Sequence, residues 1–260
     1  MKKGNYYYKE YGFEKQFSFF FEKAWEFRIG RDFHGNPWRF LPDYLPSIVI
    51  RSVSGETTFL LKGPHSKRVN FPSVEHTVIR CIRVYPFVVS SIFELNCSDI
   101  KNKIIHIDSL PDKKIDPSKY FSPDGKFENG LSEFGNAVLR ANITPSDNLI
   151  NDTLKDFIYC KGNLDYSLFI SGIGISERQF QRRFKNETGL SAREFLRILK
   201  IIKLASDIVD NDFSDRGLIY DYGYFDRPHF NRAFKEIFGV APFTFLKRQK
   251  TITYDKFIIK

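Results

Sequence analysis

Apolar positions in the first 110 residues cluster in short segments that have the character of β-strands. These segments are rich in β-branched and aromatic residues, and Gly, Pro, Asn and Ser separate them. The clearest are 47–53 (SIVIRSV), 57–63 (TTFLLKG), 77–85 (TVIRCIRVY) and 103–108 (KIIHID). Between the last two, PFVVSSIFEL predicts a short helix behind Pro86. Residues 1–110 are therefore expected to form a β-rich domain.

The pattern changes after a stretch without periodicity. Residues 111–130 contain three Pro, two Gly and many charges, which is typical of a linker or an irregular excursion. From Leu131 the apolar positions follow helical spacing, and Ser146 is a candidate N-cap for the second of two predicted helices. We expect an all-α domain over residues 131–260, and an α+β fold class for the whole chain.

A repeat with a 50-residue offset lies within this helical part. Residues 176–190 (SERQFQRRFKNETGL) align with residues 226–240 (DRPHFNRAFKEIFGV). The aligned pairs are Ser176 with Asp226, Phe180 with Phe230, Arg182 with Arg232, Phe184 with Phe234, Lys185 with Lys235, and Gly189 with Gly239.

Each copy predicts a capped helix with one apolar face and one basic face. Ser176 and Asp226 are favourable N-caps, and a Phe pair at i, i+4 anchors each helix to a core. A short apolar helix and a Gly-containing turn precede each copy, which is the helix-turn-helix pattern. The two modules extend over about 164–190 and 214–240.

The segment between the copies predicts a connecting helix. Residues 191–209 (SAREFLRILKIIKLASDIV) have strong helical spacing and would span roughly 28 Å at 1.5 Å per residue. One turn of B-DNA is about 34 Å long. Two recognition helices joined by such a strut can enter successive major grooves on one face of a duplex.

Composition adds three limits. There is no run of 18 apolar residues and no apolar signal-peptide core, so we expect a cytoplasmic protein without a membrane partner. Three cysteines without a close pair favour neither a disulfide nor a zinc site, and we expect no metal or cofactor. The net charge is +9, and residues 161–260 carry 18 Lys and Arg against 12 Asp and Glu. Such an excess attracts nucleic acid or an anionic surface.

Two segments, GISERQFQRRFKNETGLSAREFL (174–196) and YGYFDRPHFNRAFKEIFGVAPFTFLKR (222–248), resemble the double helix-turn-helix domain of AraC/XylS-type bacterial transcriptional regulators. The second is the more diagnostic, since the first has Ala192 where the family usually has Pro. The amino-terminal part is similar, more loosely, to a sensor-like domain in a subgroup of these regulators. The similar segments there are FFFEKAWEFRI, LPDYLPSIVI, LKGP, IRCIRVYPF and IIHIDSL.

This resemblance implies a transcription regulator that binds specific DNA sequences. The family's base-reading positions correspond to Arg178, Gln181, Arg182, Pro228, Asn231 and Arg232. Arg suits bidentate contact with guanine and Asn or Gln suits adenine, whereas Pro offers only van der Waals contact. The expected phosphate contacts are Gln179, Lys185, His229 and Lys235.

Other interpretations stay open. The basic helix faces can be solvated surface, or they can bind an acidic protein. The amino-terminal domain can be a small-molecule-binding or catalytic module with an accessory DNA-binding domain. No nucleophile–base pair, phosphate loop or carboxylate pair stands out, so we do not expect an enzyme. Candidate partners are double-stranded DNA, RNA polymerase, a small-molecule effector and a second copy of the chain. The cluster KGPHSKR (62–68) is either a charged turn or an anion site.

Overall fold

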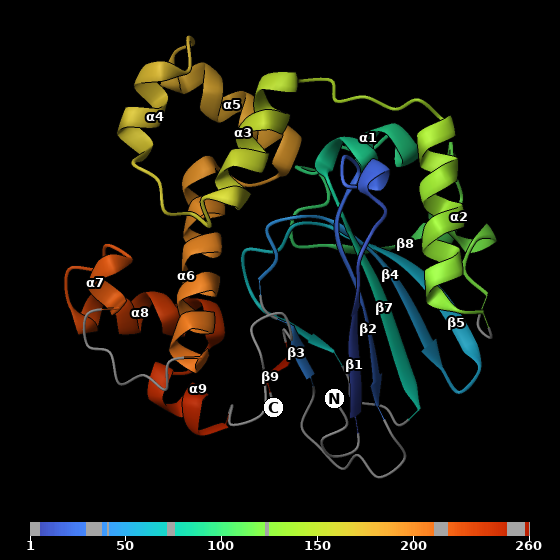
Figure 1. Ribbon diagram of the computed structural model, residues 1–260, viewed down its shortest axis with the longest axis horizontal. Coiled ribbons are helices and arrows are strands. Elements are labelled where there is room, and N and C mark those ends of the chain that lie inside the picture. The colour runs from blue at the N-terminus through green and yellow to red at the C-terminus, as the bar shows by residue number, and fades with distance from the viewer. Residues whose placement is uncertain are drawn as a thin grey trace.

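An antiparallel sheet dominates the amino-terminal half of the protein (Figure 1). The computed structural model describes residues 6–29, 38–40, 42–71, 76–122, 125–210, 218–248 and 258–259. Its main sheet has, in spatial order, strands β1 (Tyr6–Tyr11), β2 (Phe21–Ile29), β7 (Thr77–Val84), β4 (Ser47–Val53), β5 (Glu56–Lys62) and β8 (Ile104–His106). A tight turn joins β4 to β5, where Ser54 and Gly55 both have positive φ. Such a turn matches the right-handed twist of a hairpin.

Apolar side chains are buried on both faces of this sheet. Ile48 and Ile50 belong to the larger core cluster, while Val49 between them belongs to a second cluster on the opposite face. Burial on both faces explains why the sequences of β4, β5 and β7 are nearly continuous apolar runs. The strands predicted at these positions are confirmed. Strands β1 and β2 were not expected, because charged residues interrupt their apolar pattern.

Two helices cover the larger core cluster. Helix α1 (Pro86–Phe93) begins at Pro86, where a short helix was predicted. Helix α2 (Phe127–Arg140) begins four residues before the change of pattern at Leu131, and its Phe134 ring stacks on Phe21 with 5.6 Å between centroids. Helix α2 therefore packs on the amino-terminal sheet.

Shorter elements complete the amino-terminal half. Strands β3 (Trp38–Phe40), β6 (Val69–Phe71) and β9 (Ile258–Ile259) form a small second sheet, in which β9 pairs with β3. The 3-10 helices are η1 (Lys15–Phe17), η2 (Ile107–Ser109) and η3 (Pro117–Lys119).

The carboxyl-terminal half is helical, which confirms the α+β class. Its helices are α3 (Asn148–Tyr159), α4 (Tyr166–Gly172), α5 (Glu177–Thr188), α6 (Ala192–Asp210), α7 (Leu218–Asp221), α8 (Arg227–Phe238) and α9 (Pro242–Arg248). The N-cap of α3 is Asp147, whose carboxylate accepts the Ile150 N–H, so the prediction of Ser146 was wrong. The start of the predicted second module, 214–217, lies outside the described residues.

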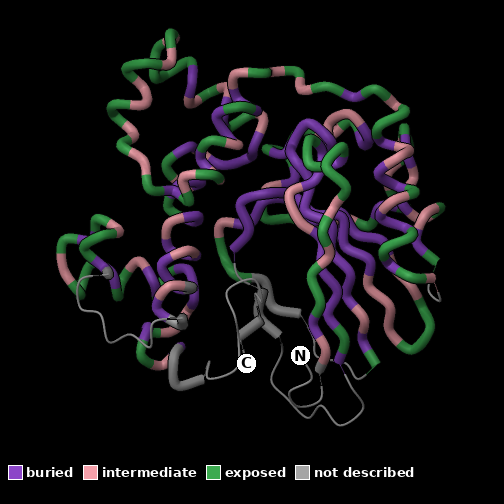
Figure 2. The backbone as a smooth tube through the Cα atoms, viewed as in Figure 1, coloured by how far each residue is buried: buried purple, intermediate pink, exposed green. Residues whose placement is uncertain are grey.

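A junction of aromatic rings joins the two halves. Phe195 of α6 lies 5.2 Å from Tyr44, 5.5 Å from Phe184 and 6.3 Å from Phe157, measured between ring centroids. Tyr44 precedes β4, whereas the other rings come from α3, α5 and α6. Figure 2 shows buried residues both along the sheet strands and along α6. One apolar core therefore extends through both halves.

Buried charges lie beside this junction. The Asp43 carboxylate is 2.9 Å from the Lys62 ammonium and 3.0 Å from the Arg83 guanidinium, which also pairs with Glu22 at 3.0 Å. Burial alone would raise the pKa of Asp43, but the charges of Arg83 and Lys62 hold it below its ordinary value. Arg83 also lies over the Tyr44 ring, 5.2 Å from its centroid. The ion cluster therefore supports the ring that contacts α6.

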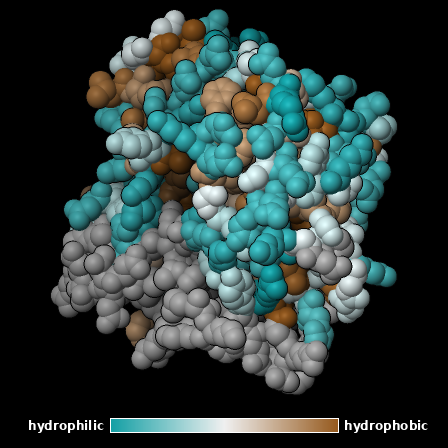
Figure 3. All heavy atoms as spheres, turned by 45° about the vertical axis from the view of Figure 1, so that its right-hand side comes forward, coloured by the Kyte–Doolittle hydropathy of each residue, from teal (hydrophilic) through white to brown (hydrophobic). Residues whose placement is uncertain are grey.

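On the face shown in Figure 3, hydrophilic side chains cover much of the described surface, and hydrophobic side chains gather near the top of the view. Within the described residues, no helix combines the length and the apolar character that a bilayer crossing requires.

Removing the ring at the junction should destabilise the protein strongly. Phe195→Ala deletes a fully buried ring shared by both halves, so the free energy of unfolding should fall by about 3–5 kcal/mol in urea titrations. Leu168→Ala is the control, since this side chain is 72% exposed and its loss should change stability by about 0.5 kcal/mol at most. Equal effects of the two substitutions would contradict a shared core.

His65 should make stability depend on pH. It is 5% exposed, and burial together with the charge of Lys62 lowers its pKa from 6.5 to about 4. As pH falls, His65 takes up a proton in the unfolded chain before it does so in the folded protein. The contribution of the neutral imidazole to the free energy of unfolding is therefore complete above pH 6.5 and is lost as pH falls towards 4. The loss can reach about 3 kcal/mol. The stability of His65→Gln should fall less over this range in urea titrations, and an unchanged slope would contradict the buried neutral imidazole.

Candidate nucleic-acid interface

Helix α5 is defined at both ends by its own side chains and backbone. The Ser176 hydroxyl accepts the Gln179 N–H at 3.3 Å, and the Gln179 side chain accepts the Ser176 N–H at 3.2 Å. This reciprocal capping box satisfies two amides of the first turn. The helix ends at Gly189, whose φ of 75° is a left-handed conformation that favours glycine.

Helix α8 repeats this construction. The Asp226 carboxylate accepts the His229 N–H at 2.7 Å, and Pro228 lies in the first turn, where no amide partner is needed. The helix ends at Gly239, with φ of 73°. The predicted caps and terminating glycines of both copies are confirmed.

The Phe pairs bury one face of each helix, as predicted. Phe180 and Phe184 of α5 and Phe230 and Phe234 of α8 are at most 1% exposed. Phe180 packs on Phe169 of α4, with 5.7 Å between ring centroids. Each of these two helices is therefore fixed by its apolar face, and the opposite face is left to solvent.

Nine of the ten side chains predicted to contact DNA are exposed. In α5 these are Arg178, Gln179, Arg182 and Lys185; in α8 they are Pro228, His229, Asn231, Arg232 and Lys235. Arg182 and Arg232 have no hydrogen bond or ion pair with any described residue. The structure therefore brings four polar or basic side chains together on α5 and, with Pro228, four more on α8.

The tenth residue, Gln181, is half-buried. Its side-chain amide donates a hydrogen bond to the Tyr166 hydroxyl of α4. The Arg193 guanidinium lies over the same Tyr166 ring, 4.9 Å from its centroid. Contact with the preceding helix thus orients Gln181, and this role of Tyr166 was not predicted.

Arg183 does not belong to the exposed basic face. Its Nε and one terminal nitrogen lie 2.6 and 2.7 Å from the two carboxylate oxygens of Asp147, the N-cap of α3. A hydrogen bond with Arg183 helps to hold the pKa of Asp147 below its ordinary value, against the effect of burial. Arg183 therefore ties α5 to α3, a role that the sequence analysis missed.

Helix α6 connects the two modules (Figure 1). Its 19 residues confirm the predicted strut and span roughly 28 Å. Asp207 of α6 accepts hydrogen bonds from Lys203 and from the Tyr222 hydroxyl, and Arg197 pairs with Glu236 of α8. Together with the apolar core that α6 shares with Phe230 and Phe234, these polar contacts hold the second module to the strut.

Lys235, one of the predicted phosphate contacts, also faces a hollow in the protein. Lys235 lines this hollow of about 470 Å³ together with Arg68, Arg197 and Glu236. Within the described residues, no group of three or more His, Cys, Asp or Glu could hold a metal ion.

Residues 171–248 match the family described as "Helix-turn-helix domain". The TetD protein of transposon Tn10 from Escherichia coli is 28% identical over 102 residues, which are 37% of this chain and 73% of that protein. The probable transcription factor PqrA from Proteus vulgaris is 25% identical over 103 residues, 38% of this chain and 84% of the relative. The crystal structure of ToxT from Vibrio cholerae O395 aligns with a TM-score of 0.45 and 11% identity, over 96% of this chain and 100% of ToxT.

The two N-caps should act locally and independently. Ser176→Ala should accelerate hydrogen exchange of the first-turn amides of α5, and Asp226→Ala those of α8, because each loses about 1 kcal/mol of capping energy. Each variant serves as the control for the other. If either substitution changes exchange in both helices equally, the caps are not local.

Proposed function

We propose that this chain, whose residues 171–248 form an AraC-type helix-turn-helix domain, is a transcription regulator that binds specific DNA sequences through α5 and α8. One observation carries the proposal. The same capped, glycine-terminated helix with an exposed polar face occurs twice, at the two ends of α6. A solvated charged surface does not require such a repeat. The domain is of a kind found in regulators rather than enzymes.

The two exposed faces suit the major groove. Arg178, Arg182 and Arg232 can each donate two parallel hydrogen bonds to guanine, and Gln181 and Asn231 can pair with adenine. Pro228 offers van der Waals contact to a base or sugar. The roughly 28 Å length of α6 is close to the pitch of B-DNA, about 34 Å. This similarity supports the reading of two successive groove segments.

Flanking residues would hold the protein on the duplex. Gln179, Lys185, His229 and Lys235 are exposed beside the base-reading positions and would contact phosphates. Such contacts add affinity without sequence preference, and affinity should therefore fall as salt rises.

The amino-terminal half is proposed to regulate this binding in the cytoplasm. Its sheet shares one apolar core with α5 and α6, so a change in the sheet can reach the recognition helices. A small-molecule effector, a second copy of the chain and RNA polymerase are the partners proposed for regulation. Selection of duplexes from a random library is the direct test of sequence-specific binding.

Arg182→Ala and Arg232→Ala should each weaken binding to a selected duplex by about 1–3 kcal/mol and relax base preference at one position. Each substitution removes an exposed guanidinium that has no partner among the described residues. Fluorescence anisotropy on the selected duplex and on single-base variants measures both effects.

The matched controls are Arg183→Ala for α5 and Arg197→Ala for the second module. Each removes one positive charge, but these guanidinium groups pair with Asp147 and Glu236. The controls should keep the base preference of the original protein, although the loss of a contact that holds the helix can lower affinity for every duplex. The assignment of base contacts is wrong if Arg182→Ala and Arg232→Ala keep full affinity and selectivity.

A further inference from the structure

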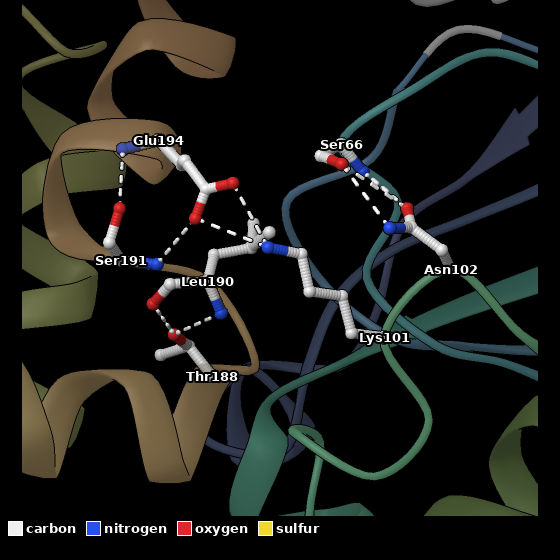
Figure 4. A network of polar contacts seen from close by, with 7 residues as sticks. All are labelled: Ser66, Lys101, Asn102, Thr188, Leu190, Ser191 and Glu194. Carbon is white, nitrogen blue, oxygen red and sulfur yellow. Dashed lines mark hydrogen bonds and ion pairs between the residues drawn. The ribbon is translucent and has the colours of Figure 1, made fainter.

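Two loops at one end of the sheet are bound together. We name them the double loop, residues 63–68 and 97–103. The Gly63 N–H donates to the Lys103 carbonyl at 3.0 Å, the Asn102 N–H donates to the Pro64 carbonyl at 2.9 Å, and the Asn102 side-chain oxygen accepts the Ser66 N–H at 2.9 Å (Figure 4). A Cβ at Gly63 would lie only 1.9 Å from the Ile100 carbonyl oxygen. The two loops therefore form one closely packed unit.

The double loop contacts the first module where α5 ends and α6 begins. A Cβ at Gly189 would lie 2.5 Å from the Cys97 carbonyl oxygen, so the backbones touch there. The Lys101 ammonium lies 2.9 and 3.2 Å from the two carboxylate oxygens of Glu194. Glu194 also accepts the Ser191 N–H at 2.9 Å, in the first turn of α6 (Figure 4). Lys101 is thus tied to the capping interaction of the strut.

The same double loop contacts the second module where α8 ends. The Arg68 guanidinium donates to the Phe238 carbonyl at 3.4 Å. A Cβ at Gly239 would lie 1.6 Å from the nearer terminal nitrogen of Arg68. Unpaired carbonyls give a helix C-terminus a partial negative charge, which a guanidinium stabilises.

The contacts of the double loop at the ends of α5 and α8 lie at equivalent positions of the 50-residue repeat. Gly189 and Gly239 occupy the same position in the two copies, so both recognition helices end against one unit of the amino-terminal half. The double loop is therefore a second connection between the modules, beside α6.

We propose that the double loop sets the position of α8 relative to α5, with Arg68 as the positioning residue for α8. This inference rests on the proposed function, because relative position matters when two helices must enter successive grooves. It also gives Arg68, in the cluster KGPHSKR, a role beyond a charged turn. A shift of the double loop against the sheet would move both recognition helices, which is a route by which the amino-terminal half can regulate DNA binding.

The test is a distance measurement on the full chain without DNA. Nitroxide labels are placed at two exposed positions, Asn186 of α5 and Arg227 of α8, in a Cys160→Ser background. Cys81 and Cys97 are buried. Pulsed electron–electron double resonance, which measures the distance between the two labels, should give one narrow distance distribution for the parent. It should give a broader or shifted distribution for Arg68→Ala. Lys101→Ala, at the other contact, should act in the same direction.

Lys67→Ala is the matched control. It removes the same charge from the same loop, and Lys67 makes no hydrogen bond or ion pair with a described residue. Its distance distribution should equal that of the parent. On a selected duplex, Arg68→Ala should bind about tenfold more weakly than Lys67→Ala, while both should bind equally to a duplex that keeps only the segment read by α5.

Identical distance distributions for the parent, Arg68→Ala and Lys101→Ala would overturn the inference, because α6 alone would then set the geometry. That result leaves the proposed function intact if the parent still selects a duplex. If the parent selects no duplex, the proposed function fails, and the distance measurement still decides whether the double loop positions α8.

Discussion

The burial of one ring, that of Phe195, is the constraint on which the rest of the structure depends. The ring lies in the first turn of α6 and contacts Tyr44, which lies just before β4 of the sheet, as well as Phe184 of α5. Because these rings cannot separate without exposing apolar surface, the first module is fixed to the amino-terminal sheet. The rest of α6 connects this fixed first module to the second one. The positions of the exposed faces of α5 and α8 therefore depend on packing at this junction.

The two ends of α6 are held differently. Its first turn is surrounded by rings that come from both halves. Its later turns bury Ile201, Leu204 and Ile208 in the same apolar core as Phe234 of the second module, and the hydrogen bond between Asp207 and Tyr222 adds a polar contact. Besides α6, the contact of Arg68 with α8 links the second module to the amino-terminal half.

Features that depend on neighbouring residues could be predicted from the sequence. The caps at Ser176 and Asp226, the terminating glycines and the strand at 47–53 all follow from local hydrogen bonding or from an uninterrupted apolar run. The prediction failed where competing local signals were similar. Ser146 and Asp147 are both good caps. In β2, Glu26 is neutralised in part by Arg80, which lies on another strand, β7. Contacts between residues far apart in the chain carry no local signal, so Arg68 against α8 required the structure. The domain boundaries at 110 and 130 stay a prediction.

The most direct test of the central claim is chemical protection of guanine N7 in the major groove of a selected duplex by the bound protein. Two recognition helices on one strut predict two clusters of protected guanines on one face of the duplex, about one helical turn apart. A single cluster, or uniform weak protection along the whole duplex, would contradict the claim that α5 and α8 both read DNA.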